Sequence, residues 1–132
     1  RVAMTTDVGF LVAITPANLI RLAETGNEHR ERLIRDLHDG TLCRELDVPR
    51  ELRDKLASSI RIRRPERARQ LEQIIERTGT LYPVDYWPLS LISCWLGGTV
   101  GYQSRDLPKY FGETPSRDLG LVSTEGRHTI PL

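Results

Sequence analysis

Four stretches in the first half of the chain repeat apolar residues at the spacing of an amphipathic helix. The first is expected to begin at Pro16, because a proline there gives up an N–H that would be unpaired anyway. The second is expected to begin near Asn27 and to end at Gly40, and the fourth to run from Pro65 to Gly79. The pattern predicts a helical subdomain over residues 15–79. Its apolar positions are Leu19, Leu22 and Ala23, then Leu33, Ile34 and Leu37, then Leu52, Leu56 and Ile60, then Ala68, Leu71, Ile74 and Ile75.

The pattern changes after residue 88. The run from Leu89 to Trp95 is mostly apolar and is followed by Gly97-Gly98, which is typical of a buried strand. A second apolar run spans Leu119 to Val122, and the segment between the two is longer than a hairpin needs. Within it, Leu107, Tyr110 and Phe111 lie at helical spacing and indicate a crossover between parallel strands. We expect residues 89–132 to form a strand–helix–strand segment.

Two connecting segments complete the expected organisation. Val8 to Ile14 is apolar but far too short to span a membrane, and is expected to be a buried strand or helix. Thr80 to Pro88 contains two prolines, and residues before proline avoid the α region, so an extended loop is expected there. The chain as a whole therefore predicts an α/β fold, in which a helical subdomain precedes a βαβ segment of a mostly parallel sheet.

Composition narrows the classes of function. A length of 132 residues with 39% hydrophobic residues suits one domain with a core. A net charge of +1 leaves no broad electrostatic footprint for nucleic acid, and the basic cluster from Arg61 to Arg69 is expected to be a solvated helix face. No apolar run is long enough to indicate a membrane span. Only Cys43 and Cys94 are present, too few for a disulfide framework, so a reduced cytoplasmic protein is expected. His38 and Cys43 lack the further ligands of a zinc site.

The candidate chemistry lies where the two expected strands end. Ligands of open α/β sheets bind beyond the carboxyl ends of strands, which parallel strands present at one edge. Gly97 and Gly98 have no Cβ, so their backbone can lie against a flat ring or adopt a positive φ. Ser123 and Thr124 offer hydroxyl groups to a phosphate, and Glu125 offers the hard oxygen that magnesium prefers. This combination suits ATP.

The order of these motifs resembles the middle of adenylate-forming enzymes. The sequence resembles the GH3 auxin-responsive family of acyl-acid amido synthetases in the segment from Trp87-Pro88-Leu89 to Ile92-Ser93-Cys94-Trp95, with Ser123-Thr124-Glu125-Gly126 downstream. Upstream, Thr15-Pro16-Ala17-Asn18-Leu19 and the run from Leu33 to Gly40 are similar to the helical insert of that family. The resemblance spans nearly the whole chain.

The resemblance implies a ligase that activates a carboxylic acid with ATP as an acyl-adenylate, releases pyrophosphate and passes the acyl group to an amine or amino acid. It implies that Thr124 contacts the α-phosphate, with Ser123 beside it, and that Glu125 helps to hold Mg²⁺. Thr124 and Glu125 would be the catalytic pair, while Gly97 and Gly98 would border the adenine and acyl pockets. Leu121 stands where the family has a tyrosine, so it offers adenine no aromatic ring.

The phosphate loop, ribose motif and mobile C-terminal domain of such enzymes do not occur in this sequence. The chain also begins without methionine and stops soon after the candidate site. We therefore expect residues 1–132 to be one partial domain, an internal part of a larger N-terminal domain that does not catalyse adenylation alone.

Other readings of the same residues stay open. A serine hydrolase would need glycine on both sides of Ser123 in the pattern G-x-S-x-G, where Leu121 and Glu125 stand instead. A non-enzymatic helical interaction module would use the Gly, Ser and Thr residues only for turns. His128 and Arg127 could reach the cleft of an enzyme or lie on the surface of a loop.

Overall fold

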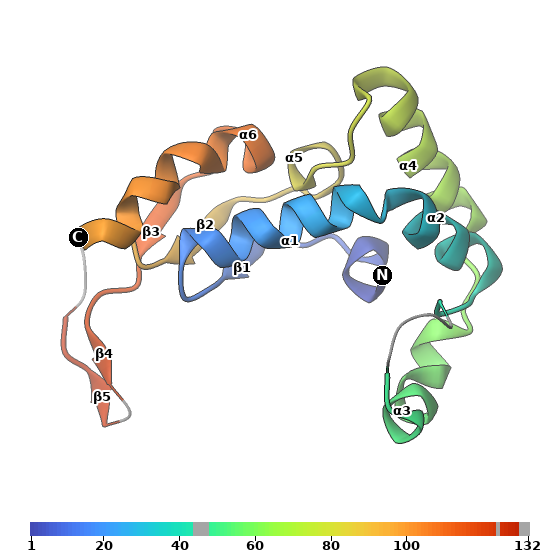
Figure 1. Cartoon of the computed structure of the whole chain (residues 1–132), viewed down its shortest axis with the longest axis horizontal. Helices are drawn as coiled ribbons and strands as arrows, with labels where there is room; N and C mark the ends of the chain where they lie inside the picture. The colour runs from blue at the N-terminus through green and yellow to red at the C-terminus, as the bar shows by residue number, and fades with distance from the viewer. Residues whose placement is uncertain (44–47, 124, 130–132) are drawn as a thin grey trace. The chain divides into compact units, whose positions relative to one another are not determined.

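The structure is a computed structural model that describes residues 1–43, 48–123 and 125–129. Two compact units divide the chain, one made of residues 1–7 and 26–81 and the other of residues 8–25 and 82–132. The first is helical and the second contains a parallel sheet (Figure 1). The α/β class predicted from the sequence is confirmed.

The helical unit is built on the packing of α2 against α4. Ile34 and Leu37 of α2 are buried, as are Ala68 and Leu71 of α4, at the helical spacing predicted for each segment. A backbone hydrogen bond from the Arg64 N–H to the Leu37 carbonyl, 2.8 Å long, ties the two helices near their ends. The unit comprises a 3-10 helix η1 (Val2–Thr5), α2 (Arg30–Asp39), α3 (Arg50–Ile60) and α4 (Pro65–Thr78).

Glycine ends both of these helices in the left-handed conformation. Gly40 follows α2 with φ 70° and Gly79 follows α4 with φ 75°, as the sequence predicts for each position. Their surroundings differ, because a Cβ on Gly40 would lie 2.7 Å from the Arg61 carbonyl oxygen, whereas one on Gly79 would meet nothing within 4 Å. Gly40 thus serves a close approach of two backbones as well as a turn.

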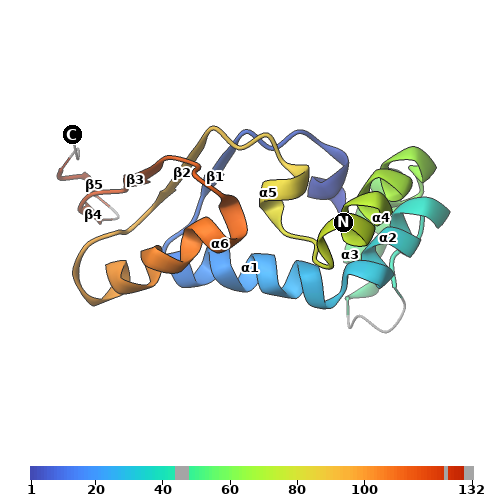
Figure 2. The same ribbon diagram turned by 90° about the horizontal axis from the view of Figure 1, so that it is seen from above.

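The sheet unit has three parallel strands in the order β1-β2-β3. Helix α1 (Pro16–Glu28) follows β1, and the crossover from β2 to β3 consists of a 3-10 helix, η2 (Gly98–Asp106), continued by α6 (Leu107–Phe111). Figure 2 shows α1 and α6 on the same side of the sheet. The strands are β1 (Phe10–Val12), β2 (Leu91–Cys94) and β3 (Ser116–Asp118).

The core of this unit lies between β2 and the two helices. Ile92 and Cys94 point into it from the strand and are fully buried. The ring of Tyr110 is buried there too, and its hydroxyl donates a 2.8 Å hydrogen bond to Glu24 Oε1 at the helix surface. The buried members of the cluster are Leu19, Ala23, Ile92, Cys94, Leu107, Tyr110 and Phe111. The crossover helix predicted from the last three of these is confirmed.

The structure differs from the sequence prediction in the position of the last parallel strand. The strand that pairs with β2 is Ser116–Asp118, which directly precedes the apolar run from Leu119 to Val122. Edge strand β3 exposes Ser116 and Arg117, so hydrophobicity does not mark it. The apolar run instead leads into a separate hairpin, in which β4 (Val122–Ser123) pairs antiparallel with β5 (Gly126–Arg127).

Three smaller differences concern the joints between elements. The segment from Val8 to Ile14 forms β1, but Phe10 and Val12 are 52% and 59% exposed, because the helices cover only the other face of the sheet. The expected extended loop from Thr80 to Pro88 contains a helical turn, α5 (Pro83–Tyr86), since proline is well suited to a first helical position. The helical region expected over residues 15–79 is divided, because most of α1 packs on the sheet. No helix among the described residues is long and apolar enough to cross a membrane.

Replacing each of the two glycines by alanine tests their different surroundings. Gly79→Ala is expected to lower the free energy of unfolding by about 1 kcal/mol, the cost of a Cβ in the left-handed conformation. Gly40→Ala is expected to lower it by more, because the Cβ would also collide with the Arg61 carbonyl. Urea unfolding followed by circular dichroism measures both variants, and equal losses would contradict the role of the Arg61 contact.

Candidate functional site

Two loops meet at the carboxyl edge of the sheet. Strand β2 ends at Cys94 and continues through Trp95 to Gly98, while β3 ends at Asp118 and continues through Leu119 and Gly120. Cys94 and Asp118 are directly paired in the register of the two strands. A hydrogen bond of 3.2 Å from the Leu119 N–H to the Cys94 carbonyl extends the pairing by one residue. The two loops therefore begin side by side.

The carboxylate of Asp118 binds both loops. Its Oδ2 accepts a hydrogen bond from the Leu96 N–H and its Oδ1 accepts one from the Gly120 N–H, each 2.6 Å long. Backbone hydrogen bonding from Leu96, then Gly120, holds the pKa of Asp118 below its ordinary value, and the Gly97 N–H acts in the same direction. The half-buried side chain is thus an ionised acceptor that joins the two strand ends.

Trp95 makes a second connection between the same loops. Its indole Nε1–H donates a 2.9 Å hydrogen bond to the Gly120 carbonyl. Gly120 is therefore held through both its N–H and its carbonyl, from Asp118 and Trp95 respectively. The indole remains 39% exposed, so an aromatic surface lies open beside this edge of the sheet.

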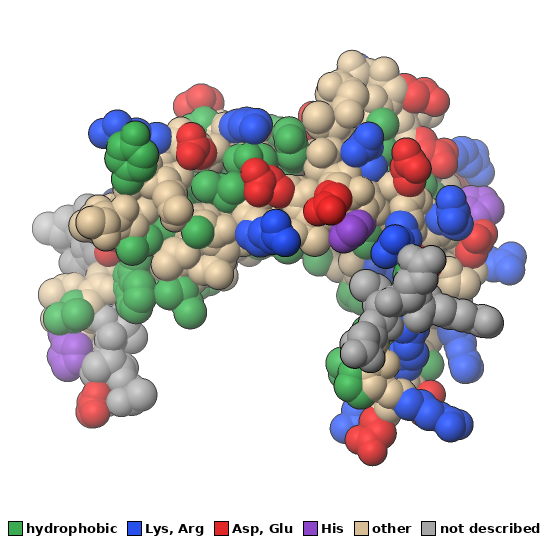
Figure 3. All heavy atoms as spheres, viewed as in Figure 1, with side chains coloured by type: hydrophobic (Ala, Val, Ile, Leu, Met, Phe, Trp, Pro, Cys, Tyr) green, Lys and Arg blue, Asp and Glu red, His purple; other side chains and the backbone are tan. Residues whose placement is uncertain are grey.

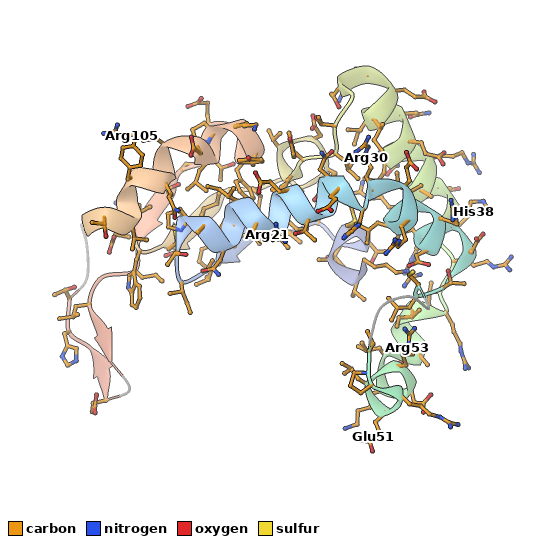
Figure 4. All side chains as sticks on the ribbon, viewed as in Figure 1. Arg21, Arg30, His38, Glu51, Arg53 and Arg105 are labelled. Carbon is orange, nitrogen blue, oxygen red and sulfur yellow. The ribbon has the colours of Figure 1, made fainter. Side chains whose placement is uncertain are left out.

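The two glycines predicted to border a ligand lie at the end of β2. Gly97 is extended, with φ −86°, whereas Gly98 has φ +62° and begins η2. A Cβ on either residue would meet no heavy atom within 4 Å, so the space beside their backbone is open. Tyr102 of η2 is 71% exposed, and the guanidinium of Arg105 lies 5.0 Å from the centre of its ring (Figure 4).

Gly101 is required for a different reason. A Cβ there would lie 1.8 Å from the Leu96 carbonyl oxygen, because the first turn of η2 folds back tightly on the end of the loop. The Gly101 N–H also bonds to the Gly97 carbonyl at 3.3 Å. The sequence analysis did not single out this glycine, although its place three residues after Gly98 is visible in the sequence.

The hairpin β4–β5 carries the other predicted site residues. Ser123 pairs with Gly126 at its end, and Glu125 is exposed in the turn between the strands. Thr124 lies outside the described residues. At the base of the hairpin the Leu121 carbonyl accepts a 2.8 Å hydrogen bond from the His128 N–H. The side chain of His128 is exposed.

The predicted site residues therefore lie in two different segments, the loop after β2 and the β4–β5 hairpin. Gly97 and Gly98 follow the end of β2, a strand of the parallel sheet, after Trp95 and Leu96, close to the position expected. Ser123 and Glu125 do not directly follow the parallel strand, because β3 ends earlier and a hairpin comes next. Asp118, the residue that links the loops, was not predicted as a site residue. Its only local signal in the sequence is a glycine two positions later, typical of an aspartate that accepts from the backbone in a turn.

Residues considered for metal or nucleic-acid binding have local partners in the helical unit. His38, labelled in Figure 4, has its Nδ1 2.8 Å from Asp39 Oδ1. The Cys43 N–H donates to Asp36 Oδ2 at 2.9 Å. In the basic cluster, Arg67 Nε donates to the Met4 carbonyl at 2.9 Å. Acidic and basic side chains are interspersed over α2 and α4 on the face shown in Figure 3.

The close approach at Gly101 gives a prediction with an internal control. Gly101→Ala is expected to lower the free energy of unfolding by about 2 kcal/mol, because the methyl group forces the Leu96 carbonyl away. Gly97→Ala is expected to change it by less than about 0.5 kcal/mol, since its φ is negative and its surroundings are open. Thermal unfolding followed by tryptophan fluorescence measures both, and a stable Gly101→Ala variant would contradict the tight turn.

The lowered pKa of Asp118 predicts how its contribution to stability depends on pH. The contribution is present above the unfolded pKa, about 3.9, and is lost as the pH falls through the lower folded value. The difference in unfolding free energy between the unsubstituted chain and Asp118→Asn is therefore expected to be constant from pH 7 to about 5 and to shrink below about 4. Urea titrations at a series of pH values measure it, and a difference that persists unchanged at the lowest pH would contradict the ionised acceptor.

Comparison with known proteins agrees with the fold. The sequence matches the GH3 family N-terminal domain over residues 2–116, so the hairpin lies beyond the matched part. A solved structure of GH3.15 acyl acid amido synthetase is similar with a TM-score of 0.73 and 19% identity, covering 92% of this chain and 22% of that one. A second, AtGH3.15 acyl acid amido synthetase in complex with 2,4-DB, has a TM-score of 0.72 and 18% identity, covering 91% and 21%.

No curated protein matches the sequence. The chain spans about a fifth of the length of the two solved synthetases, and identities this low show a shared fold. The family match, in contrast, extends over most of the chain, from the first 3-10 helix to the beginning of β3. The chain therefore belongs to the GH3 family and corresponds to part of its N-terminal domain.

Proposed function

We propose that this chain is part of an ATP-dependent acyl-acid amido synthetase. The observation that carries the proposal is the open Gly97–Gly98 backbone after β2, joined through Asp118 to the loop that leads into the β4–β5 hairpin. Membership of the GH3 family supports it, as does the similarity of the fold to amido synthetases. The carboxyl edge of a parallel sheet is also where such folds bind ligands.

The proposed reaction has two steps. A carboxylate oxygen of the acid attacks the α-phosphorus of ATP, so that an acyl-adenylate forms and pyrophosphate leaves. An amine or amino acid then attacks the acyl carbonyl, the amide bond forms, and AMP leaves with the carboxyl oxygen that linked it. The neighbouring structure in complex with 2,4-DB supports a small-molecule acid as the first partner.

In this proposal the glycines and the hydroxyl side chains of the site have separate roles. The backbone of Gly97 and Gly98 borders the adenine and acyl pockets, where the missing side chains leave room for a flat ring. The hydroxyl groups of Ser123 and Thr124 bind phosphate oxygens, Thr124 at the α-phosphate. These contacts hold the phosphorus in line with the attacking carboxylate.

The magnesium ion that accompanies ATP fits the donor chemistry of the hairpin. Magnesium usually binds through one or two carboxylates together with substrate phosphates, and the exposed Glu125 offers one carboxylate in the turn. When bound, the magnesium ion would neutralise part of the negative charge of the phosphates. Glu125 would hold the ion, while Ser123 and Thr124 bind the phosphates directly. A cytoplasmic location is part of the proposal, in keeping with only two cysteines in the sequence.

Exchange of labelled pyrophosphate into ATP tests the proposal. The assay uses Mg²⁺-ATP and a panel of carboxylic acids, with this chain and with the full-length protein that contains it. We expect exchange in the full-length protein only, because the phosphate loop and ribose motif are not in this sequence. If neither protein exchanges pyrophosphate, the proposed synthetase activity is wrong and a non-enzymatic interaction module is favoured. If the isolated chain exchanges pyrophosphate, the expectation that it does not catalyse adenylation by itself is wrong.

The role of Glu125 is tested in the same full-length protein. Glu125→Gln is expected to lower exchange on the order of tenfold or more at limiting Mg²⁺, as is typical for losses around a metal site. Glu113→Gln, at an exposed glutamate of the same unit outside the hairpin, is the matched control and is expected to leave exchange unchanged. Equal rates for the two variants would remove Glu125 from the magnesium site.

A further inference from the structure

The Gly97–Gly98 turn has few contacts of its own to hold it. Neither glycine has a side chain, and the space beside each would be open to a Cβ. The following helix η2 buries none of its residues, and its close contact with this loop, at Gly101, is made to Leu96 before the turn. Its described backbone links are the Gly101 N–H to the Gly97 carbonyl, at 3.3 Å, and the bonds to Asp118. The position of the turn depends strongly on one carboxylate.

Asp118 also controls the loop that leads to the hairpin. Its second oxygen accepts from the Gly120 N–H, and Trp95 donates to the Gly120 carbonyl, so both backbone polar groups of Gly120 are hydrogen-bonded. The next residue, Leu121, begins the base of the hairpin through its bond to the His128 N–H. One side chain thus sets the backbone on both sides of the candidate site.

We propose that Asp118 is a positioning residue of the nucleotide site, which holds the Gly97–Gly98 turn at a fixed place relative to strands β4 and β5 of the hairpin. This role rests on the proposed function. Asp118 acts through the two backbones that it holds, since each of its oxygens accepts a hydrogen bond from a backbone N–H.

The chemistry of the position requires an ionised aspartate. Both oxygens face N–H donors, and an aspartate that has lost its proton offers only acceptors. Asparagine keeps the shape but places an NH₂ group against either the Leu96 or the Gly120 N–H, so one bond is replaced by a repulsive contact. The lowered pKa of Asp118 agrees with a permanently ionised side chain near neutral pH.

The decisive experiment separates positioning from stability in the full-length protein. Asp118→Asn is compared with Asp106→Asn, an exposed aspartate of the same unit without a side-chain cap hydrogen bond. Steady-state pyrophosphate exchange gives KM for Mg²⁺-ATP and kcat separately, and amide hydrogen exchange reports on Leu96 and Gly120. Thermal unfolding shows whether each variant is folded at the assay temperature.

We expect Asp118→Asn to raise KM for Mg²⁺-ATP by about tenfold, on the scale of hydrogen bonds to a charged group. The amides of Leu96 and Gly120 are expected to exchange faster, while Asp106→Asn changes neither measurement. A role in stability alone would reduce the active fraction, so kcat would fall and KM would stay the same. An unchanged KM in folded Asp118→Asn would therefore overturn the proposal.

A second variant keeps the test decisive if Asp118→Asn does not fold. Trp95→Phe removes the hydrogen bond to the Gly120 carbonyl and preserves an aromatic ring, so it loosens the same loop without touching the carboxylate. We expect a smaller rise in KM for Mg²⁺-ATP, and an unchanged KM in this folded variant would overturn the role of the loop. Absence of exchange in the unsubstituted full-length protein would overturn the proposed function itself, and with it this role.

Discussion

Strand β2 is hydrogen-bonded on both edges, and the sheet unit depends on this central pairing. Its residues pair with β1 on one side and with β3 on the other, both parallel. Ile92 and Cys94 of the same strand are buried beneath α1 and α6, so one four-residue segment supplies both the hydrogen-bond ladder and the floor of the core. Parallel strands require a crossover between them, which places η2 and α6 after β2 and brings the carboxyl ends of β2 and β3 together.

The polar interactions at that edge follow from this arrangement. Because Cys94 lies opposite Asp118, the residues that follow each strand emerge next to one another. A carboxylate at the end of β3 can then accept N–H groups that the strands themselves leave unpaired. The ladder is thus replaced, beyond its last pair, by side-chain contacts from Asp118 and Trp95. The same edge presents open glycine backbone, which is where a ligand can approach.

The helical unit is held by another combination of forces. Apolar residues of α2 and α4 form its core, and arginine side chains fasten segments far apart in sequence by donating to backbone carbonyls. Arg1 donates to the Ile62 carbonyl and Arg67 to the Met4 carbonyl. These arginines therefore stabilise the fold of the unit, although clustered arginines in a sequence can also indicate a binding surface for anions. Acidic neighbours on the same helices divide the positive charge further.

Local backbone chemistry let the sequence determine the start of α1, the end of α2 and both ends of α4, and an apolar run indicated strand β2. Pro16, Pro65, Gly40 and Gly79 restrict φ at single positions, so their effect does not depend on the rest of the fold. The sequence also indicated the parallel crossover and the glycines at the end of β2. Only the tertiary structure decided β3 and the link at Asp118. An exposed edge strand of Ser116–Asp118 has no apolar signal, and the partners of Asp118 include Leu96, more than twenty residues away, which only strand pairing brings near.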